Sequence, residues 1–172
     1  MKLMVVLASP YLQIDTTRKP VDAPSVLYHG TFAPAFDRFD NNFVGKNDYG
    51  WLGHGFYFTS AAGHAKAYLT KYRGKPANRG KIPRILSVSV DAVKLYPFTD
   101  EEYQKSVRVS TARGTSKDAL VAKHSIELTE MLKNAGFEGA CYRHKISGNP
   151  IEVVIFDAGN IHITDQNVTE SA

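Results

Sequence analysis

The chain has 172 residues, a length that suits one domain with a hydrophobic core of its own. Its hydrophobic fraction of 43%, its charged fraction of 22% and its 9 tyrosines and 9 phenylalanines exclude a disordered chain. The single cysteine, Cys141, excludes an internal disulfide and a thiolate metal cluster, and a net charge of +4 does not by itself indicate a nucleic-acid partner.

The first elements expected along the chain are a strand and a connector. The apolar run at residues 3–8 is too short for a signal-peptide core or a membrane span, so it is expected to be an opening strand. Residues 15–24 contain two prolines and several polar residues, which is typical of a connector. With one cysteine and no run of membrane length, the expected protein is soluble and cytoplasmic, without membrane contact.

Two short strands are expected on either side of a long loop. Residues 26–29 form an apolar run that ends at Gly30, and residues 55–59 form a second one. The loop at residues 32–52 mixes turn-forming and aromatic residues, which is typical of a functional or self-packed loop. Ser60 is expected to cap a helix from residue 61 to about residue 72.

The second half of the chain predicts further strands and two helices. A strand is expected at residues 84–90, and Thr99 and Glu102 form a capping-box pair for a short helix. Residues 117–134 predict the longest helix, which Gly136 would end. Three strands are expected at residues 139–143, 151–156 and 161–164. Because strands outnumber helices without a regular βαβ order, we predict an α+β fold with a largely antiparallel core.

Several common catalytic and nucleotide-binding motifs are absent from the sequence. It contains no G-x-S-x-G, no H-E-x-x-H, no paired C-x-x-C and no P-loop, and no metal site is expected. The glycine-rich residues 50–55 come before a strand, whereas the glycine loop of a Rossmann domain follows one. Dinucleotide binding by a Rossmann domain is therefore not expected.

Three segments nevertheless carry residues that could do chemistry. They are L-Y-H-G-T at residues 27–31, G-H-G-F-Y-F-T-S at residues 53–60 and N-P-I-E-V-V-I-F-D at residues 149–157. Each has an ordinary structural interpretation when taken alone. His29 could be a satisfied histidine at a strand end, Tyr57 a core aromatic, and Glu152 a solvent-facing acid at the start of a strand.

Together, and in this order, the three segments resemble the ADP-ribosyltransferase fold of the diphtheria-toxin and poly(ADP-ribose) polymerase branch. That family carries Y-H-G-[ST], G-x-G-[IF]-Y-F and E-x-[VI]-[VI]-[YF]-[DN], and a further tyrosine at the spacing that Tyr68 has from Tyr57. The sequence is also similar to compact transferase domains of phage polyvalent proteins and bacterial toxins. The resemblance covers about residues 26–164, and it implies a single domain over residues 1–172 with split, mainly antiparallel sheets and flanking helices.

The resemblance implies that the substrate is NAD⁺ and that His29, Tyr57 and Glu152 are catalytic. Glu152 would stabilise the oxocarbenium-like ribose and bind its hydroxyl. Tyr57 and Tyr68 would sandwich the nicotinamide, and the backbone of Gly30 would bind its carboxamide. His29 would bind the adenosine-side ribose. The implied NAD⁺-binding set is His29, Gly30, Thr31, Tyr57, Ser60 and Tyr68, covered by the loop at residues 32–52.

The acceptor of the ADP-ribose is less defined by the sequence. Arginine-modifying relatives carry Glu or Gln two residues before the catalytic glutamate, where this chain has Pro150, so a mono-ADP-ribosyltransferase of another protein residue is favoured. The turn at residues 144–150 occupies the acceptor side, where Lys145, Ser147 and Asn149 could touch a target or form only a polar turn.

Four competing hypotheses stay open. In the first, a basic stretch binds a nucleic-acid target or the NAD⁺ phosphates, although it could simply be a solvated loop. It consists of Lys71, Arg73, Lys75, Arg79, Lys81 and Arg84. The second hypothesis is an NAD⁺ glycohydrolase, and the third is a catalytically inactive NAD- or ADP-ribose-binding module. The fourth is RNA 2′-phosphotransferase chemistry, which would need different residues at the positions of Tyr57 and Glu152.

Overall fold

The computed structural model describes residues 5–9, 12–44, 50–91, 93–111, 117–146 and 148–168. The strands are β1 Val5–Ser9, β2 Leu12–Asp15, β3 Val21–Asp22, β4 Leu27–Thr31, β5 Phe56–Thr59, β6 Arg84–Val90, β7 Lys94–Pro97, β8 Gly139–Arg143, β9 Ile151–Ile155 and β10 Ile161–Val168. The helices are α1 Ala62–Tyr72, α2 Asp100–Thr111 and α3 Lys117–Asn134, and short 3₁₀ turns occupy Asn41–Phe43, Pro76–Asn78 and Ala158–Asn160.

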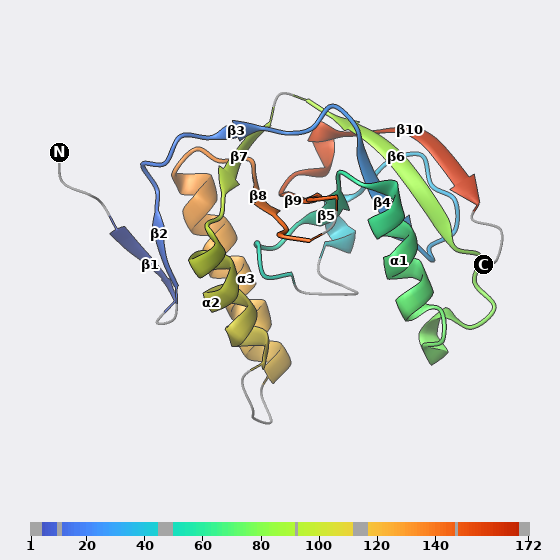
Figure 1. Cartoon of the computed structure of the whole chain (residues 1–172), viewed down its shortest axis with the longest axis horizontal. Helices are drawn as coiled ribbons and strands as arrows, with labels where there is room; N and C mark the ends of the chain where they lie inside the picture. The colour runs from blue at the N-terminus through green and yellow to red at the C-terminus, as the bar shows by residue number, and fades with distance from the viewer. Residues whose placement is uncertain are drawn as a thin grey trace.

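One large curled sheet and a separate hairpin organise the chain. The sheet has eight strands in the order β10-β6-β4-β5-β9-β8-β7-β3, and β1 and β2 form the hairpin. All neighbours in the sheet are antiparallel except β7 and β8. Figure 1 shows the three α-helices on one side of this sheet, with α1 beside β4 and the pair α2 and α3 beside β8. The expected α+β class with an antiparallel core is therefore confirmed.

The sheet is nearly split in its middle, between β4 and β5. These two strands share one residue pair, Tyr28 with Thr59, whereas β4 pairs with β6 along its whole length and β5 pairs with β9 along its whole length. The split expected from the resemblance is thus present as a weak junction within a single hydrogen-bonded sheet.

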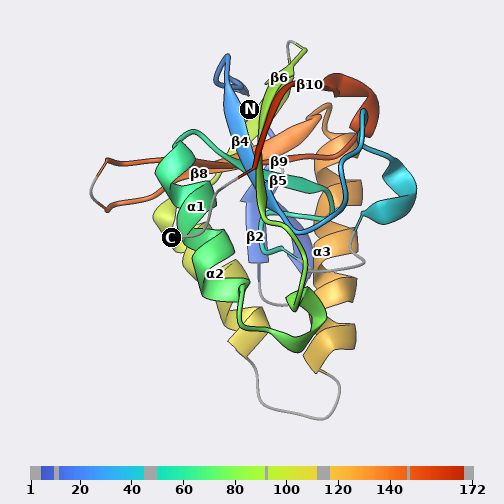
Figure 2. The same cartoon turned by 90° about the vertical axis from the view of Figure 1, so that its right-hand side faces the viewer.

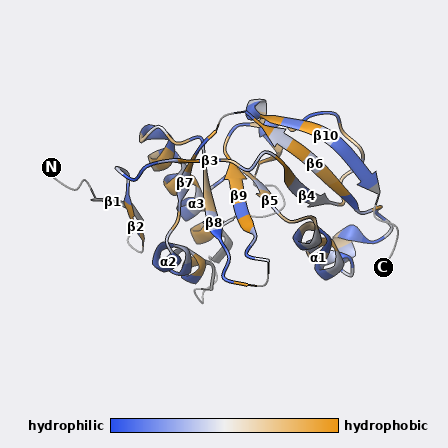
Figure 3. Cartoon of the chain, turned by 45° about the horizontal axis from the view of Figure 1, so that its top comes forward, coloured by the Kyte–Doolittle hydropathy of each residue, from blue (hydrophilic) through white to orange (hydrophobic). Residues whose placement is uncertain are grey.

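Two hydrophobic clusters cover the two faces of the sheet. One lies between the sheet and α2, α3 and the N-terminal hairpin, and it includes Leu12, Tyr96, Leu128, Leu132 and Val154, each fully buried. The other lies within the curl of the sheet and includes Leu27, Leu86, Leu95, Val153 and Ile155. Figure 3 shows hydrophobic colour on the central strand β9 and hydrophilic colour toward the turn that joins it to β8.

The helix ends follow local sequence signals in two cases out of three. Gly136 has φ of 88°, and its N–H and that of Phe137 bond back to the Lys133 and Leu132 carbonyls, so α3 ends as expected in a Schellman motif. Thr99 and Glu102 form the expected capping box. The expected cap at Ser60 is wrong. The N-cap of α1 is Ala61, which makes no side-chain cap bond, because the Ser60 hydroxyl accepts a hydrogen bond from the Ile151 amide instead.

Several further elements differ from the sequence prediction. The segment expected to be a connector at residues 15–24 holds the end of β2 and the two-residue strand β3, and β7 was not predicted. The last strand runs to Val168 because it pairs with the whole of β6. Residues 45–49 of the expected NAD⁺-covering loop, and Ser147 of the expected acceptor-side turn, lie outside the described residues.

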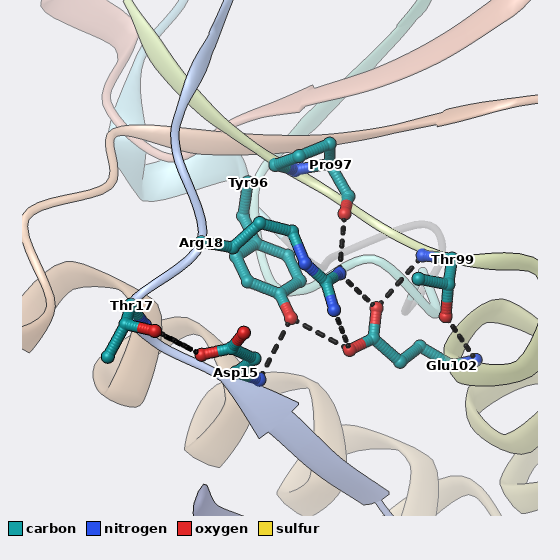
Figure 4. Close-up of polar contacts among 7 residues, drawn as sticks. All are labelled: Asp15, Thr17, Arg18, Tyr96, Pro97, Thr99 and Glu102. Atoms are coloured by element: carbon teal, nitrogen blue, oxygen red, sulfur yellow. Dashed lines mark hydrogen bonds and ion pairs between the residues drawn. The ribbon is translucent and has the colours of Figure 1, made fainter. Parts of the chain in front are cut away.

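A buried polar cluster fastens the N-terminal hairpin to the start of α2 (Figure 4). The Arg18 guanidinium donates two hydrogen bonds to the Glu102 carboxylate, at 2.7 and 3.1 Å, and a third to the Pro97 carbonyl. The Tyr96 hydroxyl donates to Glu102 at 2.8 Å and accepts from the Asp15 amide. Burial, followed by the bond to Glu102, raises the pKa of Tyr96, so the phenol stays a protonated donor.

None of the helices in the described part of the chain has the length and apolar character needed to cross a bilayer.

Candidate active site

The three segments singled out in the sequence become neighbours at the centre of the sheet. They form β4, β5 and β9, which are consecutive in the strand order. The register places Glu152 opposite Thr59 and Val154 opposite Tyr57. Because side chains alternate along a strand, Tyr57, Thr59 and Glu152 project from the same face, the one that carries the helices. This part of β5 and β9 lies between α1 on one side and α2 with α3 on the other (Figure 1).

The Glu152 carboxylate is held by two donors and keeps contact with solvent. Its side chain is 21% exposed. His144 Nε2 lies 2.7 Å from Oε2, and the Tyr103 hydroxyl donates to the same oxygen at 3.3 Å. Burial and the nearby charge of Glu152 raise the pKa of Tyr103, so its hydroxyl stays protonated. The Trp51 indole donates to the Tyr103 oxygen and completes this chain of hydrogen bonds.

Aromatic rings surround this carboxylate. Tyr103 of α2 and Tyr142 of β8 stack in parallel, with centroids 3.8 Å apart and 7° between the planes. The His144 ring stands edge-on to both, at 5.5 and 5.0 Å. His64, in the first turn of α1, has its ring 6.3 Å from that of His144. Figure 2 shows the end of the β8–β9 hairpin projecting beside the start of α1.

His144, Tyr103 and Tyr142 were not identified from the sequence as site residues. A signal for two of them was present. The turn at residues 147–150 predicts a β8–β9 hairpin, and its register pairs Tyr142 with Glu152 and hydrogen-bonds the His144 amide to the Pro150 carbonyl. Tyr142 and His144 therefore share the face of Glu152. Tyr103 reaches the site by tertiary packing of α2, for which the local sequence gives no signal.

Tyr57 anchors the glycine-rich loop that precedes its own strand. Its hydroxyl donates to the Gly53 carbonyl at 2.6 Å and accepts from the Leu52 amide at 3.0 Å. A Cβ on Gly50 would lie 1.8 Å from the phenol carbon and oxygen, so only glycine fits beside this ring. The glycines at residues 50 and 53 are thus explained by packing against Tyr57 and by a φ of 123° at Gly53.

His29 lies where β4 and β5 diverge. Its Nδ1 is 2.7 Å from the Tyr57 carbonyl, which the broken ladder would otherwise leave without a strand partner. Burial lowers the pKa of His29 and favours the neutral ring, so Nδ1–H donates and Nε2 has the free lone pair. The alternation of β4 turns this ring toward Phe39 and Phe58, on the face opposite to that of Glu152.

The remaining expected NAD⁺-binding residues have structural contacts of their own. A Cβ on Gly30 would lie 2.7 Å from the Ala65 carbonyl oxygen, so glycine here allows α1 to pack on β4. The Thr31 hydroxyl accepts from the Ala33 amide at 3.1 Å. Ser60 bonds to β9 next to Glu152. Its hydroxyl accepts from the Ile151 amide, and its own amide donates to the Ile151 carbonyl. Tyr68 is 43% exposed on α1 and its ring contacts that of Tyr72, with centroids 4.5 Å apart and 44° between the planes.

The structure therefore brings Tyr57 and Glu152 onto one face of the sheet, with Ser60 bonded to the backbone of Ile151 next to Glu152. The His29 ring lies on the opposite face and contacts the Tyr57 carbonyl. Gly30 and Tyr68 belong to the neighbouring contact of β4 with α1. Within the described residues, no group of three or more histidine, cysteine or acidic side chains is placed to hold a metal ion.

This architecture defines the chain as a protein with the ADP-ribosyltransferase fold. A chain of the crystal structure of the M.tuberculosis MbcT-MbcA toxin-antitoxin complex aligns with 89% of this chain and 88% of its own length, with a TM-score of 0.54 at 9% sequence identity. At that identity the likeness shows a shared fold alone. Residues 22–171 match the family described as ADP-ribosyltransferase in polyvalent proteins, and the chain belongs to this family. A search of curated proteins gives no match.

Proposed function

We propose that this protein cleaves the nicotinamide–ribose bond of NAD⁺ and transfers a single ADP-ribose to a protein. The observation that supports this most strongly is the Glu152 carboxylate, partly exposed on the helix-bearing face of β9 and held in place by His144 and Tyr103. An oriented carboxylate beside developing positive charge is the group that this reaction needs.

The roles of the residues follow from the chemistry of the bond. Nicotinamide leaves as a neutral molecule that keeps the electron pair of the broken bond, so no strong general acid is required. The ribose C1′ passes through an oxocarbenium-like state, which the negative charge of Glu152 stabilises. The ring of Tyr57 stacks on nicotinamide, a contact worth about 1 kcal/mol beyond area burial. We also propose that His29 Nε2 accepts a hydrogen bond from the adenosine-side ribose, because its Nδ1 is engaged by the Tyr57 carbonyl. The His29 ring lies on the face opposite to that of Glu152, so this role requires NAD⁺ to pass between the diverging strands β4 and β5.

Gly30, Thr31, Ser60 and Tyr68 complete the proposed NAD⁺-binding set. Ser60 is bonded to the backbone of Ile151, the residue before Glu152, and Tyr68 lies partly exposed on α1 in contact with Tyr72. We propose that the protein acts in the cytoplasm, since a single cysteine is compatible with a reducing compartment. Burial raises the pKa of Cys141 to about 11, which keeps it an unreactive thiol.

The test is a comparison of NAD⁺ turnover in two matched variants. Labelled NAD⁺ is incubated with the protein and a cell lysate, and nicotinamide release and label transfer are measured. Glu152→Gln should lower both by about 10²- to 10³-fold, because it removes the charge and keeps the shape. Glu130→Gln changes an exposed acid on α3 and should leave both unchanged. Absence of turnover by the wild type, or full turnover by Glu152→Gln, would contradict the proposal.

A nucleic-acid acceptor is a second candidate, supported by the surface around Tyr72. Lys75 Nζ lies 4.2 Å and Lys71 Nζ 5.3 Å from the centroid of that ring, and residues 71–84 contain no acid. Aromatic rings flanked by cations suit single-stranded nucleic acid. Label in added RNA or DNA that is lost in Lys71→Ala and Lys75→Ala would select this acceptor. Free ADP-ribose as the sole product would instead identify an NAD⁺ glycohydrolase.

A further inference from the structure

We infer that His144 is the base that takes the proton of the incoming nucleophile, and that the acceptor group is a hydroxyl of a serine or threonine in the target protein. This inference rests on the proposed function, because it concerns the second half of the same reaction. It assigns a catalytic task to a residue outside the His29, Tyr57 and Glu152 set.

The pair formed by His144 and Glu152 is built into the β8–β9 hairpin. The hairpin register puts both side chains on one face, and the His144 amide bonds to the Pro150 carbonyl at 3.0 Å. The 2.7 Å contact joins Nε2 to a carboxylate oxygen, which can only accept, so Nε2 carries the hydrogen. Nδ1 then has the lone pair that a base requires. In serine hydrolases a carboxylate fixes the tautomer of the catalytic histidine in the same way and stabilises the imidazolium that forms.

The surroundings of His144 hold the ring in place and leave it reachable. Its side chain is 25% exposed, next to a Glu152 side chain that is 21% exposed. Tyr103 from α2 and Tyr142 from β8 pack edge-on against it, and His64 from α1 faces it at 6.3 Å. Two charged residues of the neighbouring surface, Lys145 and Asp100, form an ion pair with each other, and Asp100 also accepts a hydrogen bond from the Tyr142 hydroxyl. Glu152 is thus the carboxylate that meets the imidazole.

We assign the two oxygens of Glu152 to different steps of the reaction, Oε1 to the ribose and Oε2 to His144. Among the described residues, His144 and Tyr103 both bond to Oε2. The C1′–N bond breaks and its electron pair leaves with nicotinamide. A lone pair of the acceptor hydroxyl forms the new C1′–O bond, and the hydroxyl proton moves to Nδ1 of His144. The imidazolium, stabilised by Glu152, then releases this proton to water.

The presence of an imidazole base selects among acceptor groups. A hydroxyl has lone pairs while it is still protonated, so it can attack and lose its proton as the bond forms. A guanidinium or ammonium group has no lone pair and must be deprotonated before it attacks, which an imidazole does poorly. A carboxylate is ionised already and requires no base. The hydroxyl is therefore the protein acceptor that His144 fits.

The experiment compares wild type with His144→Gln, His144→Ala and the control His162→Gln. His162 is also paired with a carboxylate, Asp91 at 3.0 Å, but it lies at the start of β10. Four quantities are measured for each protein: the melting temperature, NAD⁺ affinity by calorimetry, nicotinamide release, and transfer to lysate proteins as a function of pH. The modified residues are mapped by mass spectrometry, and the linkage is challenged with neutral hydroxylamine, which cleaves esters and spares the glycosides of hydroxyls.

We expect His144→Gln to bind NAD⁺ within about threefold of wild type while transfer falls by about 10²- to 10⁴-fold. Transfer by wild type should fall on acidification, because a protonated base cannot take the proton of the acceptor, and this fall should disappear in the variant. Added imidazole should restore transfer by His144→Ala at least about tenfold, which a purely structural role would not allow. The adducts should map to serine or threonine and resist hydroxylamine, and His162→Gln should match wild type.

Three results would overturn the inference. They are transfer by His144→Gln within about threefold of wild type, adducts on arginine or on carboxylates, and a loss of activity in His144→Ala that imidazole fails to restore although the protein is folded. Failure of the proposed function looks different. In that case wild type itself neither binds nor consumes NAD⁺, and Glu152→Gln changes nothing.

Discussion

Replacing Glu102 with alanine should destabilise the whole domain, although its side chain makes none of the contacts described at Glu152. Glu102 is 7% exposed and accepts four hydrogen bonds, two from Arg18, one from Tyr96 and one from the Thr99 amide. Removing one member of a buried ion pair costs about 3–5 kcal/mol, since the other charge is left without its partner. The Arg18 side chain is 24% exposed and can regain water, so we expect a cost near the lower limit, about 3 kcal/mol.

Urea unfolding followed by circular dichroism measures this cost directly. A loss of about 3 kcal/mol corresponds to a fall in melting temperature of about 6–12 °C in a domain of this size. The slope of the unfolding curve should stay constant, because the surface exposed on unfolding is unchanged. Glu101→Ala is the matched control. Glu101 is the preceding residue, exposed and paired with Lys105, and its replacement should leave the midpoint unchanged.

A double-mutant cycle then tests whether the ion pair is the cause. Arg18→Met and Glu102→Leu should each destabilise the protein, and the double variant should lose clearly less than the sum, because no unpaired charge is left. A loss below about 1 kcal/mol in Glu102→Ala, or additive effects in the cycle, would refute the argument that the buried pair fastens the N-terminal hairpin to α2.

Three further predictions rest on contacts at the sheet and on buried histidines. Tyr57→Phe keeps the ring but leaves two backbone groups of the glycine-rich loop, the Leu52 amide and the Gly53 carbonyl, without their hydrogen bonds. The free energy of unfolding in urea should fall by about 1–3 kcal/mol, and nicotinamide release should slow. Wild-type values for both would contradict this prediction. Gly30→Ala should lower the melting temperature through overpacking worth about 1–3 kcal/mol, because its Cβ would lie 2.7 Å from the Ala65 carbonyl oxygen, and a neutral effect would show that α1 shifts freely. Burial lowers the pKa of His29, His54 and His124 below 6.5, so the unfolded chain binds more protons just below that pH and stability should fall as the pH drops from 7 to 5. His124 is 2% exposed, and His124→Asn removes its share of this loss of stability. The loss of unfolding free energy between pH 7 and pH 5 should therefore be smaller in the variant, by about 1.4 kcal/mol per pH unit of pKa lowering. The same dependence on pH as in wild type would count against the prediction.

Elements with strong local signals could be predicted from the sequence. The bounds of α3 and β6 match the prediction, since each has a clear hydrophobic pattern and α3 ends at a glycine with positive φ. The strands that carry Tyr57 and Glu152 were also found, because their motifs are local. Short elements such as β3 and β7 were missed. They are strands only because β7 pairs with β8 and β3 pairs with β7, and such pairing is set by the whole sheet.

The site shows the same limit. The side chain of Ser60 has the chemistry of a helix cap, but the amide of Ile151, distant in sequence, competes for its hydroxyl. From the sequence, His144 is recognisable only as the first residue of a turn. Its contact with Glu152 depends on which residue of β9 lies opposite the end of β8. Local sequence patterns indicate which residues could be catalytic, and the strand register determines which of them come into contact.

The single Tyr28–Thr59 pair makes the middle of the sheet a seam between two halves, one bearing His29 and the other bearing Glu152. A seam with so few backbone bonds opens at lower free energy than the ladders on either side of it. Amide hydrogen exchange should therefore be fastest along the facing edges of β4 and β5. His29 and Glu152 lie on opposite faces, so NAD⁺ that reaches both would pass between β4 and β5, and a slowing of exchange at these edges would report its binding before any chemistry occurs.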